Sequence, residues 1–308
     1  MTPWTFAHIN DTQPGSPRSY RYKPALQENE DSAYAQLRAL KPELLLVGGD
    51  LTRDGVLHEF ELWEAKARLD ALGIPYHAIP GNMDVGNRVI GITGSHAYRH
   101  APEWTVSRPT LQNFAKVFGE FPWTLVHRDV RFTGIYAAVT GSGLAEEAQF
   151  WDFMGKLAEA PRVRHHVLVM HYAPFIEHPD EPEWDANNPE QYHDAYFTLA
   201  RADRLRLHEA FLRAGVEIVL SGHIHCRRPV QVRDGIRFYK TAAPSFPQWT
   251  NRWPDGDGTL GFYTFEVSDA GIRETFVPLT NPSNRPDSYG PGGHPAPETR
   301  DYRLAWVK

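Results

Sequence analysis

Five short apolar runs, each followed at once by a polar cluster, most constrain what this chain can fold into. The runs lie at residues 5–9, 44–47, 76–79, 167–170 and 218–220. Their length and their β-branched and aliphatic content predict buried strands. Helical periodicity predicts helices between them, at residues 31–40, 58–72, 146–160 and 203–214. Because strands alternate with helices, we predict an α/β architecture.

The polar clusters that end these strands carry the chemistry. In chain order they are Asp11-Thr12-Gln13, Gly49-Asp50, Gly81-Asn82-Met83-Asp84, His171 and Gly222-His223-Ile224-His225. Each cluster alone is weak evidence, because an isolated histidine is more often structural than functional. Ligands of α/β sheets gather beyond the carboxyl ends of the strands, so five such clusters in order predict one shared site.

Composition limits the partners that we expect. The chain has 308 residues and a net charge of -6, without a basic stripe, so we expect no nucleic acid duplex as partner. A single cysteine, Cys226, excludes an intrachain disulfide and suggests a reducing, cytoplasmic location. No run approaches the roughly 20 apolar residues of a membrane span, and residues 1–10 lack a signal-peptide pattern, so no membrane partner is expected.

The ordered clusters, over about residues 5–226, resemble the calcineurin-like metallophosphoesterases. Their pattern is Asp-x-His, Gly-Asp, Gly-Asn-His-Asp/Glu, His and Gly-His-x-His. The resemblance implies a two-sheet β-sandwich core flanked by helices, in four α/β/β/α layers. It also implies two divalent metal ions (Mn, Fe, Zn or Ni) and a metal-bridging hydroxide that attacks a phosphate ester.

The same resemblance implies a ligand for each position of the metal centre. Asp50 would bridge the two ions. The first ion would be held by Asp11, Gln13, Asp50 and His225, and the second by Asp50, Asn82, His171 and His223. Independently of the family, mixed oxygen and imidazole ligands suit the four metals named above.

Two positions depart from the family pattern. Gln13 replaces a histidine, as in a subgroup related to calcineurin-like phosphoesterase domain-containing protein 1, and a neutral amide predicts looser binding of the first ion. Met83 replaces a histidine that, in the family, stabilises the transition state and can protonate the leaving oxygen. A thioether has no proton to donate. Loss of a general acid costs about 10²–10⁴ in rate for poor leaving groups.

Other residues near the predicted strand ends could contribute to catalysis or substrate binding. Asp84, His96 and His193 are candidates for the missing catalytic group, although an exposed loop histidine is the simpler reading of the latter two. Arg53 could bind a phosphate oxygen, with Asn82 as a second contact, or be an exposed turn residue. Trp184 could form the floor of a substrate pocket or anchor a loop.

We divide the chain into a phosphoesterase domain at 1–280 and a Pro/Gly-rich arm at 281–308. The domain carries loop insertions at about 86–122, where regular signals are few, and at 177–203. We expect the aromatic end of the arm to pack either on its own domain or on a second copy of the chain. The second arrangement would give a homodimer.

The leading functional hypothesis is hydrolysis of a small-molecule phosphomonoester or phosphodiester. A phosphoprotein phosphatase is the second, although the acidic segment 177–194 would repel acidic phosphopeptides. A degenerate metal-binding scaffold of the same fold is the third. Six retained ligands favour an enzyme, because a scaffold does not need a full set of ligands for the second metal ion.

Overall fold

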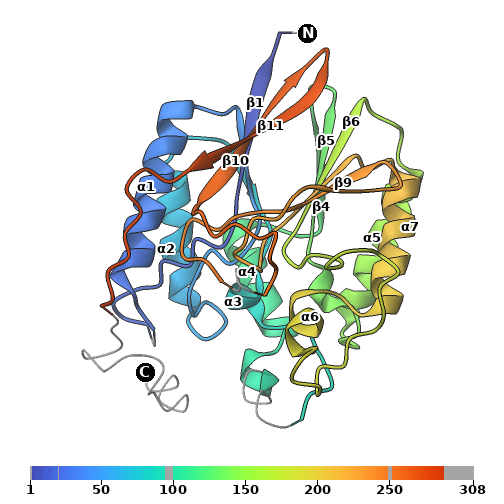
Figure 1. Ribbon diagram of the computed structural model, residues 1–308, viewed down its shortest axis with the longest axis horizontal. Helices are drawn as coiled ribbons and strands as arrows, with labels where there is room; N and C mark the ends of the chain where they lie inside the picture. Colours follow the sequence, from blue (N-terminus) through green and yellow to red (C-terminus); the bar gives the residue numbers. More distant parts are fainter. Residues whose placement is uncertain (1, 20, 94–99, 249–251, 288–308) are drawn as a thin grey trace.

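Two β-sheets form the centre of the molecule (Figure 1), which is a computed structural model describing residues 2–19, 21–93, 100–248 and 252–287. The first sheet has the order β11-β10-β1-β2-β3 and the second the order β4-β5-β6-β7-β9-β8. The first sheet consists of β1 Trp4–Ile9, β2 Leu44–Val47, β3 Tyr76–Ala78, β10 Gly261–Ser268 and β11 Gly271–Pro278. The second consists of β4 Trp123–His127, β5 Val130–Ile135, β6 His165–Met170, β7 Ile218–Ser221, β8 Gln231–Arg233 and β9 Ile236–Lys240.

Helices cover the outer faces of both sheets (Figure 1). Helices α1 Pro24–Leu40 and α2 Glu59–Asp70 lie on the first sheet, and α5 Ala145–Glu159 and α7 Arg201–Ala214 lie on the second. The shorter helices are α3 Asn82–Val85, α4 Arg108–Phe118 and α6 Tyr192–Phe197, with 3-10 turns at Pro102–Trp104 and Ala137–Val139. These layers confirm the predicted α/β/β/α sandwich.

Side chains alternate along the strands between two apolar environments. Phe6 in β1, Phe132 in β5 and Phe265 in β10 belong to the cluster between the sheets, where the Phe6 ring stacks on Phe265 at 4.8 Å. Ala7 and Ile9, the intervening residues of β1, belong to the cluster that includes residues of the helices. Successive residues of a strand point to opposite faces of the sheet. A strand that is covered on both faces therefore needs apolar residues at every position, which explains the short continuous apolar runs.

The strand order brings the polar clusters to one edge. Strands β1, β2 and β3 are parallel neighbours in one sheet, and β6 and β7 are parallel neighbours in the other. Their carboxyl ends are also joined directly, because the Asp11 amide donates to Gly49 O (2.9 Å) and the Gly222 amide to His171 O (3.0 Å).

The predicted elements are largely confirmed, with boundary differences. Helix α1 begins at Pro24 instead of residue 31, since proline suits the first turn of a helix. The segment 86–122, expected as a loop insertion with few regular signals, contains helix α4. Ser107 accepts a hydrogen bond from the Thr110 amide at its start, and Leu111, Phe114 and Val117 form its buried stripe.

The described part of the arm, residues 281–287, runs along α1 (Figure 1). The Ser283 amide donates to Asn29 Oδ1 (2.6 Å), and Arg285 pairs with Glu28 at 2.7 Å. The rest of the arm, 288–308, lies outside the described residues, and the homodimer contact stays a prediction.

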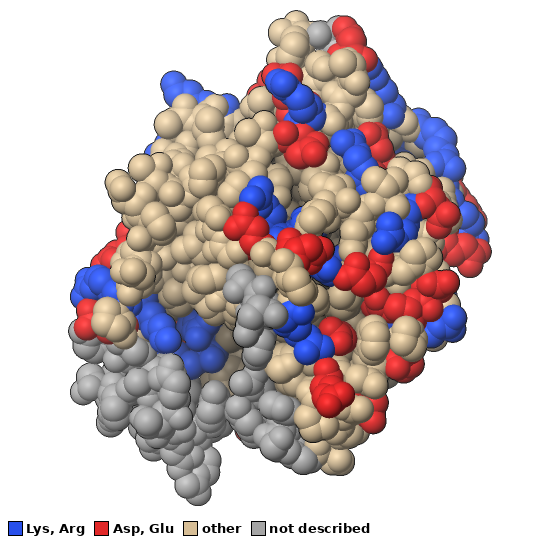
Figure 2. All heavy atoms as spheres, viewed as in Figure 1, with Lys and Arg blue, Asp and Glu red and all other residues tan. Residues whose placement is uncertain are grey.

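Charged side chains of both signs are interspersed on the face drawn in Figure 2. Within the described ranges, we find no helix that combines the length and the apolar character needed to cross a bilayer.

Candidate metal centre

One group of potential ligands meets where β2, β3, β6 and β7 end. We call Asp50, Asn82, His171 and His223 the His171 cluster. Ligand atoms of Asp50, His171 and His223 lie within 4.8 Å of one another, and all three residues are buried. His171 Nε2 is 3.0 Å from Asn82 Oδ1 and 3.3 Å from Asp50 Oδ1. Oxygens of two different side chains therefore lie next to one imidazole nitrogen.

Backbone carbonyls orient the imidazoles of this cluster. His171 Nδ1 donates to Gly48 O (3.0 Å), which directs Nε2 at Asp50 and Asn82. His223 Nε2 donates to Tyr196 O (3.4 Å), which leaves Nδ1 for the centre. Such second contacts fix tautomer and ring direction in metal-ligating histidines.

The electrostatics of the His171 cluster favour a cation. Burial alone would lower the pKa of His171, but the charge of Asp50, a hydrogen bond to Asp50 and the charge of Asp11 outweigh it and raise this pKa to about 9. Burial also raises the cost of charge on His223 and lowers its pKa, helped by repulsion from His171. Two buried carboxylates thus stabilise positive charge at His171 Nε2, where a metal ion would also bind.

A second group of potential ligands lies next to the first and shares Asp50 with it. We call Asp11, Gln13, Asp50 and His225 the His225 cluster. Ligand atoms of Asp11, Asp50 and His225 lie within 4.8 Å of one another. His225 Nδ1 donates to Phe246 O (3.0 Å), so its Nε2 lone pair faces Asp11 Oδ1 at 3.1 Å.

Asp11 Oδ1 is buried and accepts no well-aligned hydrogen bond from the described residues. Burial alone would raise the pKa of Asp11, but the charges of His225 and His171 hold it below its usual range. A buried carboxylate oxygen opposite an imidazole nitrogen fits a cation between them.

Gln13 lies in this cluster with its amide turned away from metal ligation. Its Oε1 accepts from Arg53 Nη1 at 2.8 Å, and its Nε2 donates to Asp50 Oδ2 at 2.6 Å. Guanidinium is a donor and carboxylate an acceptor, so the two neighbours together allow one orientation of the amide. The Nε2 atom also lies 3.4 Å from His225 Nε2. The amide N–H groups therefore point at lone pairs that a metal ion would use.

Backbone strain concentrates at these clusters. Left-handed φ values occur at Asp11 (54°), Gln13 (40°), Asp50 (54°), His223 (70°) and His225 (48°). Such a conformation costs a non-glycine residue about 1–3 kcal/mol and is typical of functional sites. Close packing adds a second constraint, because a Cβ at Gly81 would lie 2.1 Å from Asp50 Oδ1.

The Metallophos family model, described as calcineurin-like phosphoesterase, matches residues 5–227. The chain belongs to this family.

Several named proteins are similar in sequence to this calcineurin-like phosphoesterase. The human serine/threonine-protein phosphatase CPPED1 is 25% identical over 158 residues, which is 49% of this chain and 42% of that protein. Its counterpart from Danio rerio is 27% identical over 266 residues, 80% of this chain and 71% of that protein. An Arcobacter nitrofigilis protein named "Probable glycerophosphodiester phosphodiesterase GpdQ" is 26% identical over 155 residues, 46% of each chain. The chain thus spans less than half the length of the human and Arcobacter proteins.

Solved structures share the fold of this phosphoesterase. Purple acid phosphatase PPD1 from yellow lupin has a TM-score of 0.57 at 14% identity, over 99% of this chain and 55% of the lupin chain. The Plasmodium protein GAP50, described as the anchor in the inner membrane complex, has a TM-score of 0.54 at 14% identity, over 98% of this chain and 92% of that chain.

Asp84, predicted as a catalytic residue, connects two ligand loops of the phosphoesterase. It accepts hydrogen bonds from the Gly81 amide (2.8 Å), the Thr52 amide (3.0 Å) and Thr52 Oγ1 (2.7 Å). Burial, followed by repulsion from Asp50, raises the pKa of Asp84 to about 7. These contacts position the loops that carry Asp50 and Asn82.

Other residues predicted to act in catalysis or substrate binding make the following contacts. His193 lies on helix α6, and its ring contacts the rings of Tyr192 and Phe197 on the same helix. Trp184 donates to Glu181 Oε1 (3.2 Å) within its own loop, and Arg53 contacts Gln13 directly. His96 lies outside the described residues. Their functional roles remain predictions.

Residues beyond the sequence predictions also surround the centre. Tyr196 on α6 packs on His223 with ring centroids 4.9 Å apart, and its hydroxyl lies 3.4 Å from Asn82 Nδ2. Phe246 packs on His225 at 4.5 Å and lies 5.3 Å from the Arg53 guanidinium. Neither aromatic residue stands at a strand end or in a family motif, so the sequence contained no signal for them.

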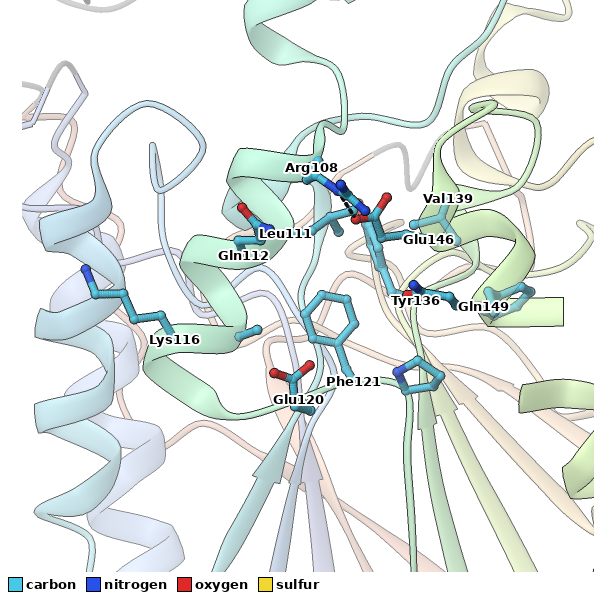
Figure 3. Close-up of a pocket in the computed structure, with 13 residues that line it drawn as sticks. Arg108, Leu111, Gln112, Lys116, Glu120, Phe121, Tyr136, Val139, Glu146 and Gln149 are labelled. Atoms are coloured by element: carbon cyan, nitrogen blue, oxygen red, sulfur yellow. Dashed lines mark hydrogen bonds and ion pairs between the residues drawn. The ribbon is translucent and has the colours of Figure 1, made fainter. Parts of the chain in front are cut away.

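A separate pocket of about 480 Å³ lies between α4 and α5 (Figure 3). Arg108 and Glu146 pair across it at 2.7 Å, and Phe121 and Tyr136 lie among its lining residues. No residue of the two clusters lines it.

Proposed function

We propose that the chain is a metal-dependent hydrolase of a small-molecule phosphomonoester or phosphodiester, using two divalent ions (Mn, Fe, Zn or Ni). The observation that carries the proposal is the pair of buried ligand clusters that share Asp50. A carboxylate common to two clusters can hold two cations together despite their repulsion. Two such cations, when bound, supply Lewis-acid chemistry and a nucleophile at neutral pH.

The chain's own residues would divide the remaining tasks. Asp50, Asn82, His171 and His223 would hold one ion, and Asp11, Asp50 and His225 the other. Gln13 would join the second set only after its amide turns over. Arg53, partly exposed at the same place, presents a planar donor group suited to a phosphate oxygen.

Phosphoprotein phosphatase activity is the second candidate, favoured by the names of the CPPED1 relatives. Exposed acidic residues occur in the segment near α6, among them Glu183, Asp185 and Glu190. Their charge disfavours acidic phosphopeptides, so we rank the small-molecule substrate first. The scaffold hypothesis is ranked last because it does not account for the buried, strained ligands.

Metal analysis and an assay with activated esters test the proposal. Purified protein is analysed for bound metals and assayed with Mn on p-nitrophenyl phosphate and bis-p-nitrophenyl phosphate. We expect bound metal and turnover of at least one ester, both lost in Asp50→Ala, with the exposed Asp185→Ala as the matched control. Metal-free wild-type protein with turnover equal to that of Asp50→Ala would contradict the proposal.

A further inference from the structure

Tyr196 and Met83 converge on the same atom at the edge of the His171 cluster. Tyr196 Oη lies 3.4 Å and Met83 Sδ 3.5 Å from Asn82 Nδ2. Asn82 itself is buried, whereas Tyr196 and Met83 are both partly exposed. The phenol of Tyr196 therefore reaches the side of Asn82 that the side chain of residue 83 also occupies.

The surrounding structure fixes the position of Tyr196. Arg88 Nη2 donates to Ala195 O (2.7 Å), and Arg88 is buried in the segment that follows α3. The Tyr196 carbonyl accepts from His223 Nε2 (3.4 Å), and its ring packs on the ring of the same histidine. Helix α6 is thus tied to the loop that carries Asn82 and Met83 and to a ligand of the centre.

The chemistry of the two side chains differs. The Met83 thioether offers no hydrogen to a developing negative charge, whereas a phenol O–H can donate one. Tyr196 Oη lies 3.3 Å from Asn87 Oδ1, a long contact from which the rotating hydroxyl can turn to a substrate oxygen.

We propose that Tyr196 donates a hydrogen bond to the leaving-group oxygen of the substrate, in place of a donor at position 83. This inference rests on the proposed phosphoesterase function. It assigns the enzyme to esters whose leaving oxygen is a poorly stabilised alkoxide, because such an oxygen gains most from a donor. A nitrophenolate delocalises its own charge and gains little.

The test compares leaving groups in Tyr196→Phe. We expect kcat for an alkyl phosphate ester to fall about 10- to 100-fold and kcat for the matching nitrophenyl ester to fall less than about 3-fold. Tyr192→Phe is the matched control, because Tyr192 lies on the same helix as Tyr196 but its hydroxyl contacts His100 Nε2 (3.3 Å). That variant should leave the alkyl-to-nitrophenyl ratio unchanged.

Restoring a donor at the neighbouring position gives a second readout. Met83→His in the Tyr196→Phe background should recover at least about 10-fold of the lost alkyl-ester rate, with unchanged metal content. Equal losses on both esters, the same loss in Tyr192→Phe, or no recovery would overturn the role of Tyr196. Wild-type protein inactive on both esters would instead overturn the proposed function, and the inference with it.

Discussion

The two ligand clusters share Asp50 and the same buried setting, but they differ in how ready they are for a metal ion. In the His171 cluster, Asn82 turns its carbonyl oxygen toward His171 Nε2 at 3.0 Å. In the His225 cluster, Gln13 turns its carbonyl oxygen toward Arg53 and its N–H groups toward Asp50. Two side-chain amides in similar positions thus face opposite ways, and a neighbouring arginine makes the difference.

This difference predicts unequal metal affinities. A metal ion in the His225 cluster must displace the Gln13 N–H groups from Asp50 and His225, or the amide must turn and lose its contact with Arg53. Hydrogen bonds to charged groups contribute about 1.5–3 kcal/mol each. An ion in the His171 cluster replaces at most a proton. We therefore expect the His171 cluster to fill first.

The largest effect expected is on the more tightly bound ion. His171→Ala should weaken it at least about 100-fold, the upper end of what loss of an outer-shell partner costs. His225→Ala should leave the same ion within about 3-fold of wild type and weaken the other ion instead. Metal titration of chelator-treated protein measures both, with the exposed His178→Ala as control. If His225→Ala weakened the more tightly bound ion and His171→Ala did not, the His171 cluster would not be the tighter site.

A smaller effect is expected from releasing Gln13. Arg53→Met removes the donor that holds Oε1 and a nearby positive charge, so the weaker ion should bind about 10-fold more tightly. Arg53→Lys is the matched control, because it keeps both a donor and the charge. If Arg53→Met leaves the weaker affinity unchanged, Arg53 does not set the orientation of Gln13. The readout is metal affinity, since Arg53 is also a candidate substrate contact.

The smallest effect concerns the loop that carries Arg53. Glu61 Oε2 accepts from the amides of Arg53 (2.9 Å) and Asp54 (2.8 Å). Burial, followed by the charge of Asp54, raises the pKa of Glu61 to about 8. A carboxyl whose folded pKa is raised contributes stability below its unfolded pKa, and that contribution is lost as pH rises through the folded pKa.

Thermal unfolding between pH 6 and 9 measures this loss. Wild-type Tm should fall about 2–4 °C more across the range than that of Glu61→Gln. Glu64→Gln, on the same helix and paired with Arg18 at the surface, should follow the wild type. Parallel curves for wild type and Glu61→Gln would show that the Glu61 carboxyl does not titrate in this range.

The sequence predicted those parts of the centre that strand ends determine. Asp11, Asp50 and His171 lie within three residues of the ends of apolar runs, and parallel strands bring these ends to one edge. Strands β1, β2 and β3 and helices α1, α2, α5 and α7 followed from periodicity, with differences at their boundaries. By contrast, β4 and β5 were missed because they are joined by a tight turn within one stretch, without a helix between them.

The orientations of side chains in the centre could not be predicted from the sequence. The direction of the Gln13 amide depends on Arg53, 40 residues away along the chain. Tyr196 reaches Asn82 from a segment 114 residues distant, through packing of α6. Asp11 and His225 have left-handed φ values where their loops meet distant segments, the Asp11 amide donating to Gly49 O and His225 O accepting from the Gln248 amide. All three features involve contacts between residues far apart in the sequence, so local sequence patterns could not predict them.

The most direct test is a metal titration of chelator-treated wild-type protein and Gln13→His. The account predicts two steps in the wild type that differ at least about 10-fold in Kd. In Gln13→His an imidazole replaces the amide, and the weaker step should approach the stronger one. Two equal steps in the wild type, or a weaker step that Gln13→His leaves unchanged, would contradict the account.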